Sequence, residues 1–172
     1  MTSYAVLLRG VNVGGVTVRM AELAELVRGM GYGGVRTVLA SGNLLLDSDE
    51  AAPVVKERLQ QALRERFGYE AWVHVLSTEE LRAIVEAYPF ERGREGWHDY
   101  TIFVLDPALR DELLAIETDP AVESTAPGDR SVYWTVPKGD TLGSVIGKAQ
   151  AAARFKPWLT NRNVNTLERM LG

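Results

Sequence analysis

The chain has 172 residues, enough for one large domain or two small ones with a self-standing core. Hydrophobic residues make up 46% and charged residues 24%, a composition that excludes a disordered or collagen-like chain. The sequence has no cysteine, which excludes disulfides, thiolate metal sites and cysteine nucleophiles, and which fits the cytoplasmic location that we expect.

The formal net charge of -4 argues against a protein that coats nucleic acid, but it is spread unevenly. Residues 1–43 carry four basic and two acidic side chains, residues 44–137 nine and nineteen, and residues 138–172 six and two. The two basic ends form an anion-attracting patch if they meet in space, and they are two solvated faces if they do not. No apolar run approaches the roughly 20 residues that span a bilayer, so we expect no membrane association.

The first 76 residues alternate between strand and helix patterns. The apolar run 4–8 predicts a strand, and apolar residues at helical spacing predict a helix over 20–30. Two strands of a hairpin follow at 35–39 and 44–46. A second helix is expected to be capped by Ser48 or Asp49 with Pro53 in its first turn, and a strand follows at 71–76. This order, βαββαβ, is that of a ferredoxin-like unit.

The second half repeats this order after a short additional helix. Ser77 and Glu80 have the spacing of a capping box and predict a helix that ends at Pro89. The glycine-rich, charged segment 90–98 is predicted to be a linker. Strands and helices then recur, in the order strand 100–105, a helix from 106, strands near 122 and at 132–136, a helix over 141–155, an extended piece at 157–159 and a last helix ending at 171.

The predicted fold class is therefore α+β, with two tandem ferredoxin-like (βαββαβ) halves and additional helices. The first half is expected over 1–89 and the second over 99–172.

A charged, glycine-rich segment directly follows the first strand. Because the helix after it is a crossover, the first two strands run parallel, and the end of the first strand should lie beside the hairpin turn. Glycines let backbone N–H groups approach an anion, and an arginine offers a forked partner for phosphate or carboxylate. The alternative is an ordinary turn in which the arginine pairs with a local acid. The candidate ligand-binding residues here are Arg9, Gly10, Asn12, Gly14, Gly15, Ser41, Gly42 and Asn43.

A second polar cluster lies near the C-terminus. Thr160 or Asn161 is expected to cap the last helix, which needs only one of them. The surplus amides indicate a hydrogen-bonding surface, and the sequence leaves open whether it joins the Arg9 edge. Its candidate residues are Arg162, Asn163, Asn165 and Thr166.

The sequence contains no recognisable catalytic constellation, so whether the protein is an enzyme stays open. The segment 143–148 lacks the spacing of a phosphate loop and the Ser or Thr that follows its lysine. The only histidines are His74 and His98, and His74 falls in an apolar strand, as a packed imidazole would. We therefore expect no metal site and no cofactor.

Four segments in this order resemble the bacterial domain-of-unknown-function 1697 (DUF1697) family. They are Leu7 to Gly15, Met20 to Leu23, Val35 to Asn43 with its Ser-Gly-Asn turn, and Thr160 to Thr166. The resemblance implies two ferredoxin-like halves in a cytosolic bacterial protein, and it supplies no activity or catalytic residue. Val164 departs from the family, which often has tryptophan there.

Two hypotheses of function follow. In the first, the Arg9 glycine loop binds a phosphate-bearing small molecule or a nucleic-acid backbone, and Phe103 and Tyr133 offer a small platform for RNA bases. In the second, the chain is a protein-interaction or self-association module, such as a homodimer, with no small-molecule ligand. Trp97, Trp134 and Trp158 motivate that alternative, because tryptophan is enriched at interfaces.

Overall fold

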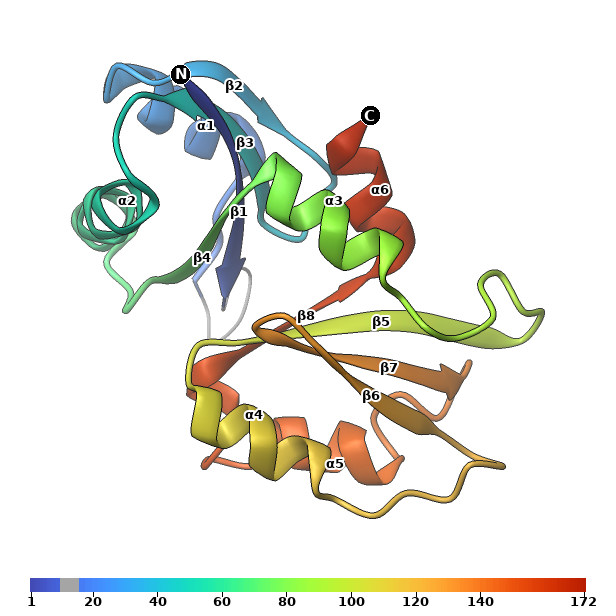
Figure 1. Ribbon diagram of the computed structural model, residues 1–172. Helices are drawn as coiled ribbons and strands as arrows, with labels where there is room; N and C mark the ends of the chain where they lie inside the picture. Colours follow the sequence, from blue (N-terminus) through green and yellow to red (C-terminus); the bar gives the residue numbers. More distant parts are fainter. Residues whose placement is uncertain (10–15) are drawn as a thin grey trace. The chain divides into compact units, whose positions relative to one another are not determined.

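The computed structural model describes residues 1–9 and 16–172 (Figure 1). Within them the fold is mixed α+β, with six α-helices and two four-stranded antiparallel sheets. In chain order the elements are β1 (Thr2–Arg9), α1 (Met20–Gly29), β2 (Gly33–Thr37), β3 (Asn43–Ser48), α2 (Ala52–Phe67), β4 (Trp72–Ser77), α3 (Thr78–Glu86), β5 (Trp97–Val104), α4 (Pro107–Leu114), β6 (Ser124–Gly128), β7 (Ser131–Pro137), α5 (Val145–Ala151), the short 3-10 helix η1 (Lys156–Trp158), β8 (Leu159–Asn163) and α6 (Val164–Leu171).

The chain divides into two compact units. One comprises Met1–Ala83 together with Glu168–Gly172, and the other comprises Ile84–Leu167. Trp97 and His98, which fall in the predicted linker, are the first residues of β5. The predicted domains 1–89 and 99–172 stay a prediction.

The first sheet has the strand order β2-β3-β1-β4, with β1 antiparallel to both of its neighbours. Alternate residues of β1, Tyr4, Val6 and Leu8, pack against apolar side chains of α1 and α2, which cover this face of the sheet (Figure 1). Side chains at every second position of a strand point to the same face, which explains why these three residues reach the same core. This burial forms the core of the first unit.

The helix ends in this unit confirm two expectations and correct one. Pro53 lies in the first turn of α2, and Ser77 and Glu80 form the capping box, with Ser77 Oγ accepting from Glu80 N at 3.1 Å and Glu80 Oε2 accepting from Ser77 N at 2.7 Å. The expected cap of α2 by Ser48 or Asp49 is wrong. Ser48 ends β3, and its Oγ accepts from Glu50 N at 3.0 Å, so its hydroxyl closes the turn before the helix.

The second sheet has the order β6-β7-β5-β8, so each sheet shows the same order when its strands are numbered from the first strand of its own unit. The helices α4 and α5 pack on one face of this sheet (Figure 1), around a core that includes Ile102 and Trp134. In both sheets, the strand after the unit's first helix, β2 or β6, is an edge strand, and the unit's first strand, β1 or β5, lies in the interior.

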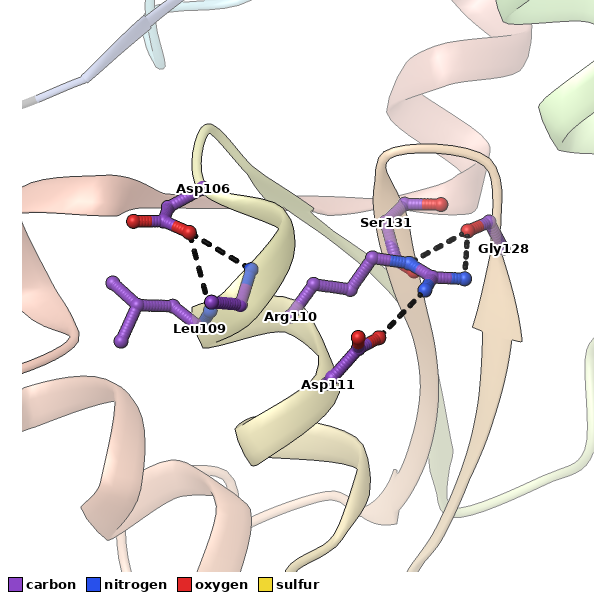
Figure 2. A network of polar contacts seen from close by, with 7 residues as sticks. Asp106, Leu109, Arg110, Asp111, Gly128 and Ser131 are labelled. Carbon is purple, nitrogen blue, oxygen red and sulfur yellow. Dashed lines mark hydrogen bonds and ion pairs between the residues drawn. The ribbon is translucent and has the colours of Figure 1, made fainter.

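Polar contacts fasten α4 to the β6–β7 hairpin (Figure 2). Asp106 caps the helix, accepting from the backbone N–H groups of Ala108 and Leu109 at 2.8 and 3.4 Å. Arg110 then donates from Nη2 to Gly128 O at 2.7 Å and from Nε to Ser131 O at 3.1 Å. Because the guanidinium satisfies carbonyls on both sides of the turn, Arg110 has a structural role.

The predicted helix over 141–155 is shorter than expected. It forms as α5 over Val145–Ala151, because Ser144 acts as its N-cap, with Oγ accepting from Gly147 N at 3.1 Å, and Ala152 turns to an extended conformation. The buried carboxylate of Glu123 also accepts from Val145 N at 2.8 Å and from Ile146 N at 3.1 Å. The protein's own anion therefore occupies this helix N-terminus.

Candidate functional site

Arg9 is the last residue of β1, and the strand register places it opposite Trp72 of β4. Directly opposed residues of antiparallel strands project to the same face, so the guanidinium and the indole are cross-strand neighbours. Partial burial lowers the pKa of Arg9, and the charge of Glu70 opposes that shift. The edge thus combines a partly desolvated cation with an aromatic ring, and an acid lies close enough to act on the cation.

The hairpin turn between β2 and β3 lies beside this end of β1. Leu8 N donates to Gly42 O at 2.8 Å, and Leu7 is the register partner of Asn43. Gly42 has φ +81°, a left-handed conformation that glycine adopts without a steric cost. The end of β1 and the hairpin turn therefore lie side by side, as the crossover connection predicts.

The side chains of the turn have different exposure. Asn43 is fully buried, and its Nδ2 donates to Val38 O and to Ser41 Oγ, both at 2.8 Å. Its amide therefore stabilises the hairpin from within. Ser41 is exposed and receives one of these bonds, so its hydroxyl is the turn's polar side chain that faces solvent.

Four of the predicted site residues, Gly10, Asn12, Gly14 and Gly15, lie outside the described residues. The first candidate set is thus described through Arg9, Ser41, Gly42 and Asn43.

The C-terminal candidates belong to the second unit, where the sequence interpretation needs a correction. Thr160 and Asn161 do not cap the last helix. They lie in β8, which pairs with β5, and α6 begins at Val164. The physical reason is that the alternating burial of this segment lets it complete the sheet, and Asn163 Oδ1 then accepts from Asn165 N at 2.9 Å at the start of the helix.

Arg162 is a buried arginine in β8, only 7% exposed. Its Nη1 donates to Thr160 Oγ1 at 2.6 Å and to Asn161 O at 2.9 Å. Burial lowers the pKa of Arg162 to about 10, which leaves it protonated at neutral pH. The other candidates of this segment are nearer to solvent, since Asn165 is exposed and accepts at Oδ1 from Arg92 at 3.3 Å, and Thr166 is half-buried in α6.

The two candidate sets therefore lie in different units, and each is described on its own. In the first unit, Arg9 and the Ser41–Asn43 turn come together. In the second, Arg162 and Asn163 lie in the same strand and Asn165 and Thr166 in the helix after it.

The aromatic platform proposed for RNA bases is not exposed. Phe103 is 1% and Tyr133 2% exposed, and the Tyr133 hydroxyl donates to Ile84 O at 2.6 Å. Trp134 is also buried, and its Nε1 donates to Glu123 Oε1 at 3.1 Å. Buried rings cannot stack on a base, so these three residues support neither an RNA platform nor a protein interface.

The described residues hold neither a metal-binding cluster nor a membrane-spanning helix. No three histidine or carboxylate side chains among them gather closely enough to hold a metal ion. None of their helices is long and apolar enough to cross a bilayer.

A polar stripe on α2 was missed by the sequence interpretation. Lys56, Gln60 and Arg64 recur four residues apart and line a groove that also includes Trp72. The apolar positions of this helix drew attention to its core face, although the same spacing of polar residues on the other face was visible in the sequence.

The model of a protein family described as "Protein of unknown function (DUF1697)" matches residues 1–133 of the chain. The chain belongs to this family. The match covers the Arg9 segment, the Ser-Gly-Asn turn and α2, and it ends before β8 and α6.

Comparison with solved structures supports the fold. A conserved bacterial protein from Streptococcus pneumoniae is similar over 99% of both chains, with a TM-score of 0.84 and 23% sequence identity. A protein of unknown function from Galdieria sulphuraria aligns over 94% of this chain and 96% of its own, with 11% identity and a TM-score of only 0.29. No curated protein matches the sequence.

Proposed function

We propose that this DUF1697 protein binds a phosphate-bearing small molecule or a nucleic-acid backbone at the edge formed by Arg9 and the Ser41–Asn43 turn. The observation that carries the proposal is the position of Arg9, a partly desolvated guanidinium beside a tight turn. Desolvation strengthens the attraction between a guanidinium and an anion, and the planar fork suits the oxygens of a phosphate. Ser41 adds an exposed hydroxyl that donates or accepts.

Glu70 is the natural competitor for this cation, since its charge already acts on Arg9. Glu70 is exposed, and the interaction of an exposed carboxylate with a guanidinium is weak and screened by salt. A bidentate phosphate carries more charge and fits the fork better, so it displaces such a partner. The alternative of a permanent local ion pair makes the opposite prediction for a Glu70 variant.

The test measures the thermal unfolding of the full chain with pyrophosphate, with ATP and with a short single-stranded oligonucleotide. A ligand that binds the folded state at about 100 times its dissociation constant adds about 2.7 kcal/mol and raises the unfolding temperature. Arg9→Gln is expected to abolish the rise that pyrophosphate produces and to reduce the rise with ATP and with the oligonucleotide, whereas Glu70→Gln is expected to increase the rise by removing the competing charge. Arg82→Gln, at an exposed arginine of α3, is the matched control and should change nothing.

Added salt should weaken the binding, because a phosphate contact releases counterions. The proposal is wrong if none of the three compounds shifts the unfolding temperature, or if Arg9→Gln binds them as well as the parent chain does.

The fold and the location complete the proposal. We infer that each unit is a ferredoxin-like half. Both units have the element order βαββαβ, and in both sheets the first strand of the unit lies in the interior, as suits that motif. A cytoplasmic location is supported by the lack of cysteine. A self-association module remains the second candidate, favoured by one observation, the 40% exposure of Trp158.

A further inference from the structure

A polar groove of about 530 Å³ runs along α2 beside the edge strand β4. Lys56, Gln60 and Arg64 occupy one face of the helix at intervals of four residues, over a length of about 12 Å. Trp72 contributes the aromatic wall. The remaining lining residues are Pro53, Glu57 and Gln61.

The indole and one guanidinium form a stacked pair at one end of the groove. The Arg64 guanidinium carbon lies 5.1 Å from the centroid of the Trp72 ring. Its Nη2 also donates to Ala71 O at 3.3 Å, directly before β4, which holds the guanidinium at the start of the strand. Arg64 makes no ion pair with an acid in the described residues, so it offers its charge and its remaining N–H groups to the groove.

Gln60 supplies an amide donor from a largely buried residue. Gln60 is only 9% exposed, and its Oε1 accepts from Val73 N at 3.2 Å. This bond fixes which end of the amide faces the strand, and it leaves Nε2 with no acceptor in the part of the chain that the structure describes. Because Gln60 lines the groove, this amide N–H is a donor that a ligand in the groove can use.

Lys56 supplies a second cation one turn away. It is half-buried, and burial lowers its pKa. It makes no hydrogen bond or ion pair within the described residues. The groove therefore presents two cations and the Gln60 amide against the single carboxylate of Glu57, whereas the Gln61 amide donates to Glu65.

We propose that this groove binds a nucleotide unit, with its phosphate held by Lys56, Gln60 and Arg64 and its base packed against Trp72. Three convergent donors suit phosphate oxygens, and an aromatic ring beside a guanidinium is a stacking surface for any base. Glu57 is the acceptor that a sugar hydroxyl or a base amino group requires. The volume is in the range of small-molecule sites.

This inference goes beyond the Arg9 site. It shares Trp72 with that edge, but its phosphate-binding side chains are different ones. The same chemistry serves a free nucleotide and a nucleotide within a single strand, and the experiment separates these sources.

The experiment titrates the full chain with UMP and with a fluorescein-labelled oligouridylate, and follows NMR shifts and fluorescence anisotropy. Trp72→Leu should weaken binding about tenfold, since stacking on one aromatic ring accounts for a change of this size, and Trp72→Phe should restore most of it. Lys56→Gln, which leaves the core untouched, should weaken binding about fivefold. Arg66→Gln removes a cation from the same helix outside the groove and should bind as the parent chain does.

If the variants change the binding of the oligonucleotide in this way, the groove is a single-strand site. If only UMP binds and its binding changes in this way, the groove is a free-nucleotide site. The proposal is overturned if neither probe binds, or if Lys56→Gln and Trp72→Leu bind like the parent chain. It is also overturned if inorganic phosphate competes as well as UMP, because the base would then contribute nothing. Loss of the Arg9 site and loss of this one are distinguishable, because Arg9→Gln should abolish the thermal shift with pyrophosphate, whereas Lys56→Gln should weaken the binding of UMP.

Discussion

The removal of one buried carboxylate, in Glu123→Ala, should destabilise the second unit strongly. Glu123 is 1% exposed and joins three donors from two elements. Its Oε1 accepts from Trp134 Nε1 and from Ile146 N, both at 3.1 Å, and its Oε2 accepts from Val145 N at 2.8 Å. The carboxylate thus ties β7 to the N-terminus of α5.

The magnitude follows from the donors that lose their acceptor. Trp134 and Ile146 are fully buried, and each unsatisfied buried donor costs about 1–3 kcal/mol. Loss of the charge at a helix N-terminus adds about 0.5 kcal/mol. The expected loss is therefore about 2.5–6.5 kcal/mol, which is a large part of the stability of a small unit. Glu123→Gln should cost less, about 1–2 kcal/mol, because an amide oxygen keeps two of the donors while its Nε2 opposes Val145 N.

The assay is urea unfolding followed by tryptophan fluorescence, with amide hydrogen exchange to assign the loss to the second unit. The Ile146 amide and the Trp134 indole N–H should exchange faster in Glu123→Ala than in the parent chain. Glu117→Ala, at an exposed carboxylate in the same segment between α4 and β6, is the control and should stay within about 0.5 kcal/mol. A loss below about 1 kcal/mol in Glu123→Ala would refute the reasoning.

Two further outcomes are expected. Gly147→Ala should unfold the start of α5, because the added Cβ would collide with the backbone carbonyl of Thr141. Ordinary overpacking costs about 1–3 kcal/mol, so we expect the free energy of unfolding, measured in urea, to fall by more than about 3 kcal/mol. Tyr32→Phe tests a titration, since burial and then the hydrogen bond to Glu50 raise the pKa of Tyr32 to about 12. The unfolded chain releases this proton near pH 10 and the folded chain only near 12, so the contribution of Tyr32 to stability falls across this interval. The free energy of unfolding, measured in urea, should fall less steeply between pH 10 and 12 in Tyr32→Phe than in the parent chain. Equal dependence on pH in the two proteins would contradict the assignment.

Several local features were predictable because their causes lie within a few residues. The capping box of Ser77 and Glu80, the position of Pro53 in α2 and the apolar alternation of β1 follow from backbone geometry and side-chain spacing alone. The approach of the Ser41–Asn43 turn to the end of β1 was predictable for a topological reason, since a crossover makes two strands parallel.

The wrong expectations concern residues whose local preference competes with a distant partner. Thr160 is a good helix cap in isolation, but β5 offers the 159–163 segment a full set of strand hydrogen bonds, and the helix starts later. Ser48 similarly closes a turn instead of capping α2. Phe103 and Tyr133 are aromatic residues of neighbouring strands, as an RNA platform requires, and only the packing around them shows that they are buried.

The sequence by itself determined the family, the α+β class and the order of strands and helices, because these depend on periodicity, capping and turn residues that act over short distances. Tertiary structure alone decided which polar groups are structural and which face a ligand. Asn43 turns inward to donate to a backbone carbonyl, and Glu123 turns inward to accept from backbone and indole N–H groups. Lys56 and Gln60, by contrast, retain donors along a groove. A side chain's partners lie far away in the sequence, so its hydrogen bonds and its burial are fixed only when the chain is folded.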